Sequence, residues 1–204
     1  MAESKESIAS QVLSPETAEK AKRELNEVPE ERARAVEELR ENAKRAAEAE
    51  NVTLEGLDDD HFLLRFLRCK KFRQEDSLKK YLCYCRFKDT NPELFDGLCV
   101  DRVRYIYERN VFGVLEPRLK NGCKMIVMFP SRADLSTVDF KDLIGAGFLL
   151  LSRLLEDPET QVHGVLVLRC WEGVSFLDMM RMQVFFRKQA STFAALFQVR
   201  VKAV

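Results

Sequence analysis

The segment His61–Lys88, HFLLRFLRCKKFRQEDSLKKYLCYCRFK, combines an apolar face with a dense set of basic side chains. It contains nine Lys and Arg residues and only two acidic residues, Glu75 and Asp76. Its apolar residues recur at spacings of three and four, which predicts a helix from about Gln74 to Lys88. Such a helix can bury one side in a core and present cations to an anionic partner on the other.

The residues before this segment also carry helical signals. Ser14-Pro15-Glu16 is a good helix start, because a hydroxyl can cap the helix, proline fits the first turn and an acid suits its positive end. Pro29 interrupts this helix, and a second one is expected to run to about Ala49. A short helix should follow, from Asp58–Asp60 to Cys69. The first 95 residues are therefore expected to be all-helical.

The pattern changes in the second half of the chain. Short apolar runs at 124–129, 163–168 and 199–204 predict strands, and the segments 138–156 and 176–197 between them predict helices. This alternation favours right-handed crossovers and a mostly parallel sheet. We expect an α/β protein with an all-helical domain at 1–96, whose first 13 residues are disordered, and an α/β domain at 97–204.

The net charge of zero hides a separation of charge along the chain. Residues 1–60 carry 17 acids and 9 bases, whereas the remaining residues carry 16 acids and 24 bases. A polyanionic partner is therefore plausible: membrane headgroups, a nucleic acid or an acidic protein. Nucleic acid is the least favoured of these, because the basic segment lacks interleaved exposed aromatics and any recognised module.

Several classes of protein are disfavoured by composition. The first ten residues contain no apolar stretch typical of a secretory signal, and the longest apolar run, Leu143–Leu151, is too short to span a bilayer. The six cysteines are expected to be reduced, and two histidines are too few for a convincing zinc site or catalytic set. Gly145-Ala-Gly147 lies within a predicted helix, so it does not indicate a dinucleotide cofactor. We expect a cytoplasmic protein that is not an enzyme and needs no metal or cofactor.

Four stretches together resemble one family. Arg65–Phe72 (RFLRCKKF) looks like the RFLRARKF signature in the N-terminal helical domain of CRAL-TRIO lipid-transfer proteins. Ser14–Glu27, Glu156–Gly164 and Leu196–Ala203 are similar to three further segments of the branch that contains clavesin, the retinaldehyde-binding protein and the alpha-tocopherol transfer protein.

The resemblance implies a soluble lipid carrier. Family members hold one hydrophobic molecule, such as a retinoid, tocopherol or phospholipid, in an α/β sandwich and exchange it at membranes. In this branch a basic cleft also recognises a phosphoinositide headgroup, which implies peripheral association with endosomal or trans-Golgi membranes. The family domain continues past the position of Val204, so the chain is expected to be truncated relative to its relatives.

Carried over by position, the headgroup cleft would use Lys70, Arg200 and Lys202, with Arg68 as a further candidate. Arg200 and Lys202 are two apart on a predicted strand, so their side chains should leave the same face. Lys70 lies in the other half, so the cleft requires the halves to dock. Structural roles in capping or ion pairing remain the alternative, above all for Arg68 and its neighbour Arg65.

The apolar residues of the second half allow two interpretations. Six of them could line a lipid pocket: Phe148, Leu149, Leu151, Leu155, Val165 and Val167. They could equally form an ordinary packed core, since apolar periodicity does not separate the two. The function has an alternative too, a helical protein-interaction module at 1–95 with a vestigial second domain.

Overall fold

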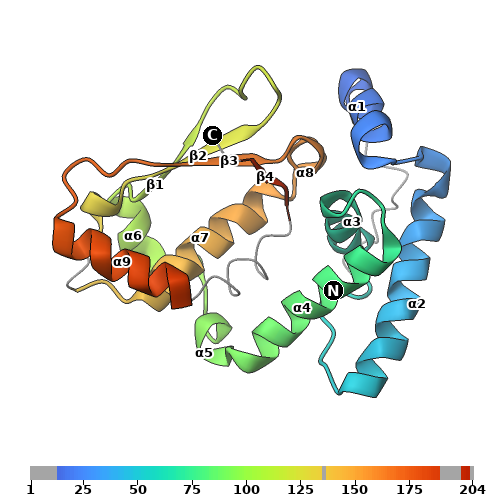
Figure 1. Ribbon diagram of the computed structural model, residues 1–204, viewed down its shortest axis with the longest axis horizontal. Helices are drawn as coiled ribbons and strands as arrows, with labels where there is room; N and C mark the ends of the chain where they lie inside the picture. Colours follow the sequence, from blue (N-terminus) through green and yellow to red (C-terminus); the bar gives the residue numbers. More distant parts are fainter. Residues whose placement is uncertain (1–12, 135–136, 189–198, 203–204) are drawn as a thin grey trace.

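The computed structural model describes residues 13–134, 137–188 and 199–202 (Figure 1). The helices are α1 (Pro15–Leu25), α2 (Arg32–Glu50), α3 (Asp60–Cys69), α4 (Gln74–Thr90), α5 (Pro92–Phe95), α6 (Val100–Glu108), α7 (Phe140–Leu154), α8 (Pro158–His163) and α9 (Phe176–Lys188), with 3-10 turns η2 (Pro29–Glu31) and η3 (Pro130–Arg132). The strands are β1 (Phe112–Leu115), β2 (Lys124–Met128), β3 (Val165–Arg169) and β4 (Val201–Lys202). The expected α/β class is confirmed.

The helical start signals work as predicted. The Ser14 side chain caps α1 by accepting a hydrogen bond from the Thr17 N–H at 3.3 Å, and Pro15 occupies the first turn. Asn26 ends the helix in the left-handed conformation. Asp59 caps α3 in the same way, by accepting a hydrogen bond from the N–H of Phe62 at 3.0 Å.

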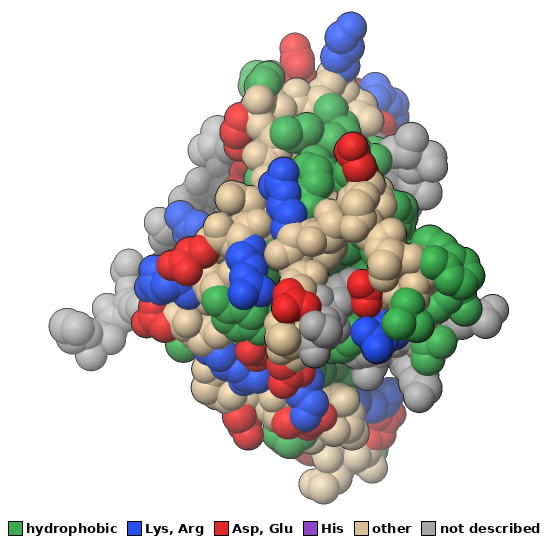
Figure 2. All heavy atoms as spheres, turned by 90° about the vertical axis from the view of Figure 1, so that its left-hand side faces the viewer, with side chains coloured by type: hydrophobic (Ala, Val, Ile, Leu, Met, Phe, Trp, Pro, Cys, Tyr) green, Lys and Arg blue, Asp and Glu red, His purple; other side chains and the backbone are tan. Residues whose placement is uncertain are grey.

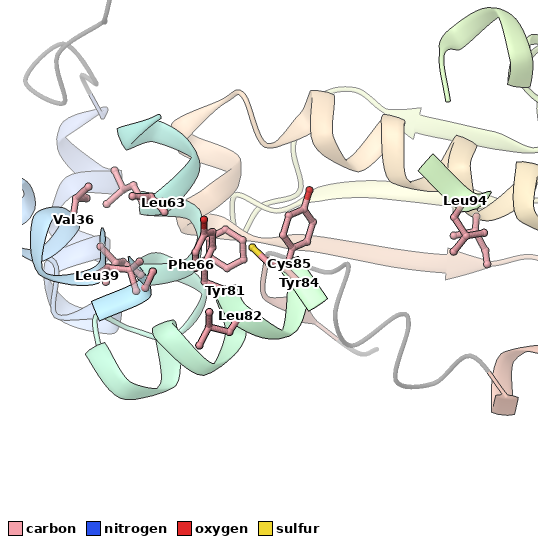
Figure 3. Packing of buried hydrophobic residues seen from close by; sticks show 13 residues of the cluster. Val36, Leu39, Leu63, Phe66, Tyr81, Leu82, Tyr84, Cys85 and Leu94 are labelled. Carbon is pink, nitrogen blue, oxygen red and sulfur yellow. The ribbon is translucent and has the colours of Figure 1, made fainter. Parts of the chain in front are cut away.

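The first half has its own apolar core, built from α2, α3 and α4 (Figure 3). Phe66 and Tyr81 pack edge to face with ring centroids 5.2 Å apart, a geometry that aromatic pairs favour. The buried Ile144 and the partly buried Phe148 of α7 pack against this same cluster. The helical half therefore shares its core with a helix from the second half.

The second half contains one sheet with strand order β1-β2-β3-β4. β2, β3 and β4 are parallel, as expected, and β1 is added antiparallel to β2 at the edge. Ile126 pairs with Val167, so both point to the same face, where Leu151 of α7 and Leu155, the residue after α7, pack against them. One sheet face is thus covered by α7.

Some sequence-based expectations are wrong, and others fall outside the described residues. The sequence does not predict β1 and α6, and the strand predicted at 163–168 begins only at Val165, because 158–163 form α8. The helix expected at 176–197 is described to Lys188, and residues 189–198 lie outside the described part. Residues 1–12, expected to be disordered, and 203–204 also lie outside it. The division into domains at residue 96 stays a prediction.

Candidate functional site at the junction of the two halves

Arg68 is part of the interior of the protein. Its side chain is fully buried and its Nε and Nη2 donate to the two carboxylate oxygens of Glu27 at 3.0 and 2.8 Å. Its Nη1 donates to the Gln161 Oε1 at 2.7 Å. The residue therefore joins α3 to the α1–α2 connection and to α8. This is the structural role that the sequence leaves open for it, and it makes Arg68 unavailable to a headgroup.

The charges of three other basic residues act on the thiol of Cys69, which ends α3. Burial raises the pKa of this thiol, and the positive charges of Lys80, Lys70 and Arg200 oppose that shift. Lys70 follows Cys69 directly, Lys80 comes from α4 and Arg200 directly precedes β4. We call Lys70, Lys80 and Arg200 the cationic junction. It brings together two of the four residues expected at the headgroup cleft.

Two charges of the cationic junction, those of Lys70 and Lys80, repel each other. Burial is the main influence that lowers the pKa of Lys80, and the charge of Lys70 lowers it further. A phosphate group placed among these side chains would relieve both effects, because it supplies negative charge and hydrogen-bond acceptors.

Arg200 is fixed by contacts with both halves. Its Nη2 donates to the carbonyl oxygen of Val162, and its Nη1 lies 3.6 Å from a carboxylate oxygen of Glu24 in α1. Its Nε is buried without a hydrogen-bond partner. The backbone around it is held by the Val165 N–H, which donates to the Arg200 carbonyl at 3.2 Å. The Nε of Arg200 is therefore still able to donate a hydrogen bond to a ligand. The backbone position of Arg200 is fixed by its hydrogen bond with the first residue of β3.

The predicted role of Lys202 stays a prediction, and Lys80 is an addition to the predicted set. Lys202 lies in β4 opposite Leu166, and its side chain is outside the described part of the chain. Lys80 is not among the site residues that the sequence predicts. Its position two turns into α4 carries no local signal, because only the crossing of α3 and α4 brings it to Cys69.

The six predicted pocket residues are divided among three clusters. Leu151, Leu155, Val165 and Val167 lie together between α7 and the sheet. Phe148 packs against the helical half, where its ring centroid lies 5.4 Å from that of Phe95. Leu149 packs against a third cluster that includes the buried Met182 of α9. Four of the six predicted pocket residues therefore lie together, and Phe148 and Leu149 each pack in a different neighbouring cluster.

An apolar surface lies on α9. Phe176 is 74% exposed and Leu177 61%, and Met180 and Val184 continue the same exposed stripe one and two turns later. Figure 2 views the left-hand side of Figure 1, where α9 lies, and shows hydrophobic side chains gathered near the right-hand edge of this view. Met182, on the opposite side of α9, is fully buried and anchors the helix.

The remaining surface gives few other candidates. A hollow of about 250 Å³ lies between α2 and the α3–α4 connection, where it is lined by residues of mixed charge such as Glu31, Arg34 and Arg73. Within the described ranges, no group of His, Cys, Asp or Glu could hold a metal ion. No helix in that same part of the chain is long and apolar enough to cross a membrane.

Comparison with known proteins identifies relatives over most of the chain. Clavesin-1 from Pongo abelii is 33% identical over 166 residues, 80% of this chain and 46% of clavesin-1. The alpha-tocopherol transfer protein-like protein from Homo sapiens is 31% identical over 193 residues, 94% of this chain and 55% of that protein. Clavesin-2 from Rattus norvegicus is 30% identical over 166 residues, 80% of this chain and 50% of clavesin-2.

The chain thus spans about half the length of the curated relatives that it matches. No protein-family model matches it. The family expected from the sequence motifs is nevertheless the family of these relatives: the curated homologues of the chain are clavesins and alpha-tocopherol transfer protein-like proteins, which belong to the CRAL-TRIO family.

Proposed function

We propose that this protein binds a small hydrophobic molecule and carries it to membranes, where it recognises a phosphoinositide headgroup. The cationic junction is the observation that carries this proposal. Lys70 and Arg200 come from opposite halves of the chain, and both act on one thiol together with Lys80. The charges of Lys70 and Lys80 repel each other, and an anion placed beside them would reduce that repulsion.

The name of the alpha-tocopherol transfer protein-like relatives supports a hydrophobic cargo. The sheet-facing cluster supplies an apolar environment that a cargo could share, with Leu151 and Leu155 opposite Val165 and Val167. A retinoid, a tocopherol or a phospholipid acyl chain would fit this chemistry. Cargo binding of this kind requires no covalent step, so the proposed activity is not enzymatic.

The exposed stripe on α9 supports contact with the membrane itself. Phe176, Leu177 and Met180 would leave water when α9 lies on a lipid surface, at a gain of about 25 cal/mol for each Å² of apolar area. Together with headgroup recognition, this gives a peripheral mode of attachment. We place the protein in the cytoplasm, with endosomal or trans-Golgi membranes as its partners.

Charge reversal tests the headgroup site. In the variant Lys70→Glu/Arg200→Glu/Lys202→Glu, co-sedimentation with phosphoinositide-containing liposomes should fall by at least about tenfold, since each Lys or Arg near an anionic surface contributes about 1 kcal/mol. Circular dichroism should show unchanged helicity. If the triple variant still sediments like the parent protein, the headgroup site is wrong.

A matched variant controls for overall charge. Arg34, Lys44 and Arg45 are exposed cations on α2, a helix that contributes no residue to the cationic junction. Their combined change to Glu alters the net charge by the same amount, and should reduce binding far less. Equal losses in the two triple variants would mean that net charge, rather than a site, attracts the protein to liposomes.

The alternative of a helical interaction module finds less support. Ile144 and Phe148 of α7 belong to the core of the helical half, and Gln161 of α8 completes the hydrogen bonds of the buried Arg68. The first 95 residues therefore depend on the second half for packing and for polar contacts. A module that acts alone would not be expected to have this dependence.

A further inference from the structure

We propose that Arg65 of α3 binds the anionic head group of the hydrophobic cargo, so that the preferred cargo is a negatively charged amphiphile with a carboxylate or phosphate. This inference rests on the proposed cargo-binding function and specifies the class of molecule carried. It concerns a different position from the cationic junction, which is proposed to contact headgroups in the membrane.

The first observation is that Arg65 has no anionic partner. Its Nε is buried and makes no hydrogen bond, and among the described residues no carboxylate lies within ion-pairing distance of its guanidinium. Arg68, one turn further along α3, is by contrast paired with both oxygens of Glu27. A partly buried guanidinium without a partner is costly, and an anion with two oxygens would match its planar fork of donors.

The second observation is the surroundings of the guanidinium. It lies over the ring of Phe62, 5.5 Å from the ring centroid. Burial lowers the pKa of Arg65, and the charges of Asp59, Glu156 and Tyr84 oppose this effect. Asp59 caps α3, Glu156 follows the end of α7 and Tyr84 belongs to α4, so charges from three parts of the fold act on Arg65.

The position differs from that of the cationic junction. Lys70, Lys80 and Arg200 are the cations that act on the Cys69 thiol. Among the described residues, none of these three is one of the groups that act on Arg65. Arg65 precedes Cys69 by one turn of α3, which is about 6 Å along the helix axis. Two anions could therefore be bound at the same time, one at each position.

The end of α7 lies close enough to Arg65 for a charge there to act on it. Phe148 of α7 packs against the helical half, to which α3 belongs, and Leu155, the residue after α7, packs toward the sheet. Leu155 directly precedes Glu156, whose charge acts on Arg65. A cargo that inserts beside the end of α7 would place its head near the guanidinium, which lies over the ring of Phe62. A neutral alcohol or aldehyde would leave the charge of Arg65 without a partner.

Binding of cis-parinaric acid and of its methyl ester, followed by fluorescence, tests the proposal. The protein should bind the acid about tenfold to a hundredfold more tightly than the ester, the range expected for hydrogen bonds to a charged group. Arg65→Gln should remove this preference by weakening only the acid, and Arg65→Lys should retain part of it. Arg104→Gln, at an exposed arginine of α6, should bind both probes like the parent protein.

Each other outcome has a definite meaning. Equal affinity of the parent protein for acid and ester would overturn the role of Arg65 and leave cargo binding intact. Equal weakening of both probes in Arg65→Gln would show that the residue only supports the fold. Binding of neither probe would overturn the cargo function as well. Binding of Arg65→Gln to phosphoinositide liposomes should be unchanged, and its loss would merge the two sites and overturn their separation.

Discussion

At the scale of single residues, the Arg68–Glu27 pair is the contact most sensitive to mutation. Both side chains are fully buried, and each carboxylate oxygen of Glu27 accepts a hydrogen bond from the guanidinium. Arg68→Ala would leave a buried carboxylate with reduced compensation, which costs about 3–5 kcal/mol in other proteins. We expect a loss of that size in the free energy of unfolding, measured by urea denaturation.

The matched control for this pair is the exposed Arg34–Glu31 pair, where Nη2 and the carboxylate oxygen are 3.6 Å apart. Arg34→Ala should change the free energy of unfolding by less than about 1 kcal/mol, because water already solvates both charges. Similar losses in Arg34→Ala and Arg68→Ala would show that burial does not determine how much an ion pair contributes to this fold.

The sequence could not distinguish the roles of Arg65 and Arg68. Both belong to the same motif and lie three residues apart on one helix. Arg68 is buried because Glu27 and Gln161, which are 41 and 93 positions away in the sequence, meet at its guanidinium. Only tertiary packing decides which of two equivalent arginines is paired. Lys70 and Arg200 are expected at the headgroup site because the family motifs include them, and that role stays a prediction.

At the scale of elements, α1 is attached to α8 by a small polar cluster around His163. Lys20 Nζ and the Asn121 carbonyl oxygen each lie 3.0 Å from His163 Nδ1, and His163 Nε2 lies 2.9 Å from Thr17 Oγ1. The hydroxyl of Thr17 donates to Glu159. Protonation of His163 would place a second positive charge beside the Lys20 ammonium and weaken this cluster.

Acid should therefore loosen α1. Burial is the main influence that lowers the pKa of His163, and the charges of Lys20 and Arg118 lower it further. The Asn121 carbonyl and the charge of Glu159 raise it, but not enough to reverse the shift. The unfolded chain takes up this proton near pH 6.5, so stability is complete above about pH 6.5 and falls as the pH drops toward the folded pKa. Amide hydrogen exchange in α1, corrected for intrinsic rates, should be faster at about pH 5.5 than at about pH 7.5.

The chain contains two histidines, so a matched control is available. His163→Gln should abolish the difference in exchange between the two pH values, whereas His61→Gln should keep it. If the exchange rates of α1 still differ between the two pH values in His163→Gln, another titratable group causes the pH dependence. Glu159 does not explain a difference between these pH values. Burial is the largest single influence on its pKa and raises it, but hydrogen bonds from Thr17 and Ser14 and the charge of His163 together lower the pKa below the usual carboxyl value.

The start of β3 depends on Gly164. Its φ is +87°, and a Cβ at this position would lie 2.5 Å from the carbonyl oxygen of Arg200. Gly164→Ala should cost about 1–3 kcal/mol, because it combines a strained backbone with a backbone clash. It should also weaken phosphoinositide binding by displacing Arg200. Urea denaturation and liposome sedimentation measure the two effects.

Gly147 of α7 provides the contrast, since a Cβ there meets only Phe112 at an ordinary distance of 3.6 Å. Gly147→Ala should raise the free energy of unfolding by up to about 1 kcal/mol, as expected within a helix. If both glycine variants behave alike, the close approach of β4 to Gly164 is not a constraint on the fold.

The elements that the sequence predicts are those with local signals. α1 has a cap and a proline, and β2 is an uninterrupted apolar run. β1 escapes prediction because its four residues show no alternation and become a strand only by pairing with β2. α8 escapes prediction because Asp157-Pro158 is typical of a helix end, although the Asp157 side chain also caps α8 by accepting from the Glu159 N–H at 2.9 Å.

At the scale of the whole molecule, the two halves are joined by both apolar and charged contacts. Phe148 of α7 packs in the helical core, Gln161 binds Arg68, and Glu24 of α1 lies beside Arg200. Phe148→Ala should therefore destabilise the entire chain, by up to about 3–5 kcal/mol if its site behaves as a full core position. Phe176→Ala, at the exposed end of α9, should be close to neutral in the same urea denaturation experiment.

The same contacts predict that residues 1–96 do not form an independent unit. Without α7 and α8, the helical core loses Ile144 and Phe148, and the buried Arg68 loses its hydrogen bond to Gln161. Newly exposed apolar surface and an incompletely paired buried charge each lower the free energy of unfolding by about 1–3 kcal/mol. These losses are large because a typical domain is stable by only about 5–15 kcal/mol. A fragment of residues 1–96 should therefore show reduced helicity and a broad, weakly cooperative thermal transition by circular dichroism, whereas the whole chain should unfold in one sharp transition. A fragment that unfolds as sharply as the whole chain, at the same midpoint, would show that the helical half is autonomous and would revive the interaction-module hypothesis.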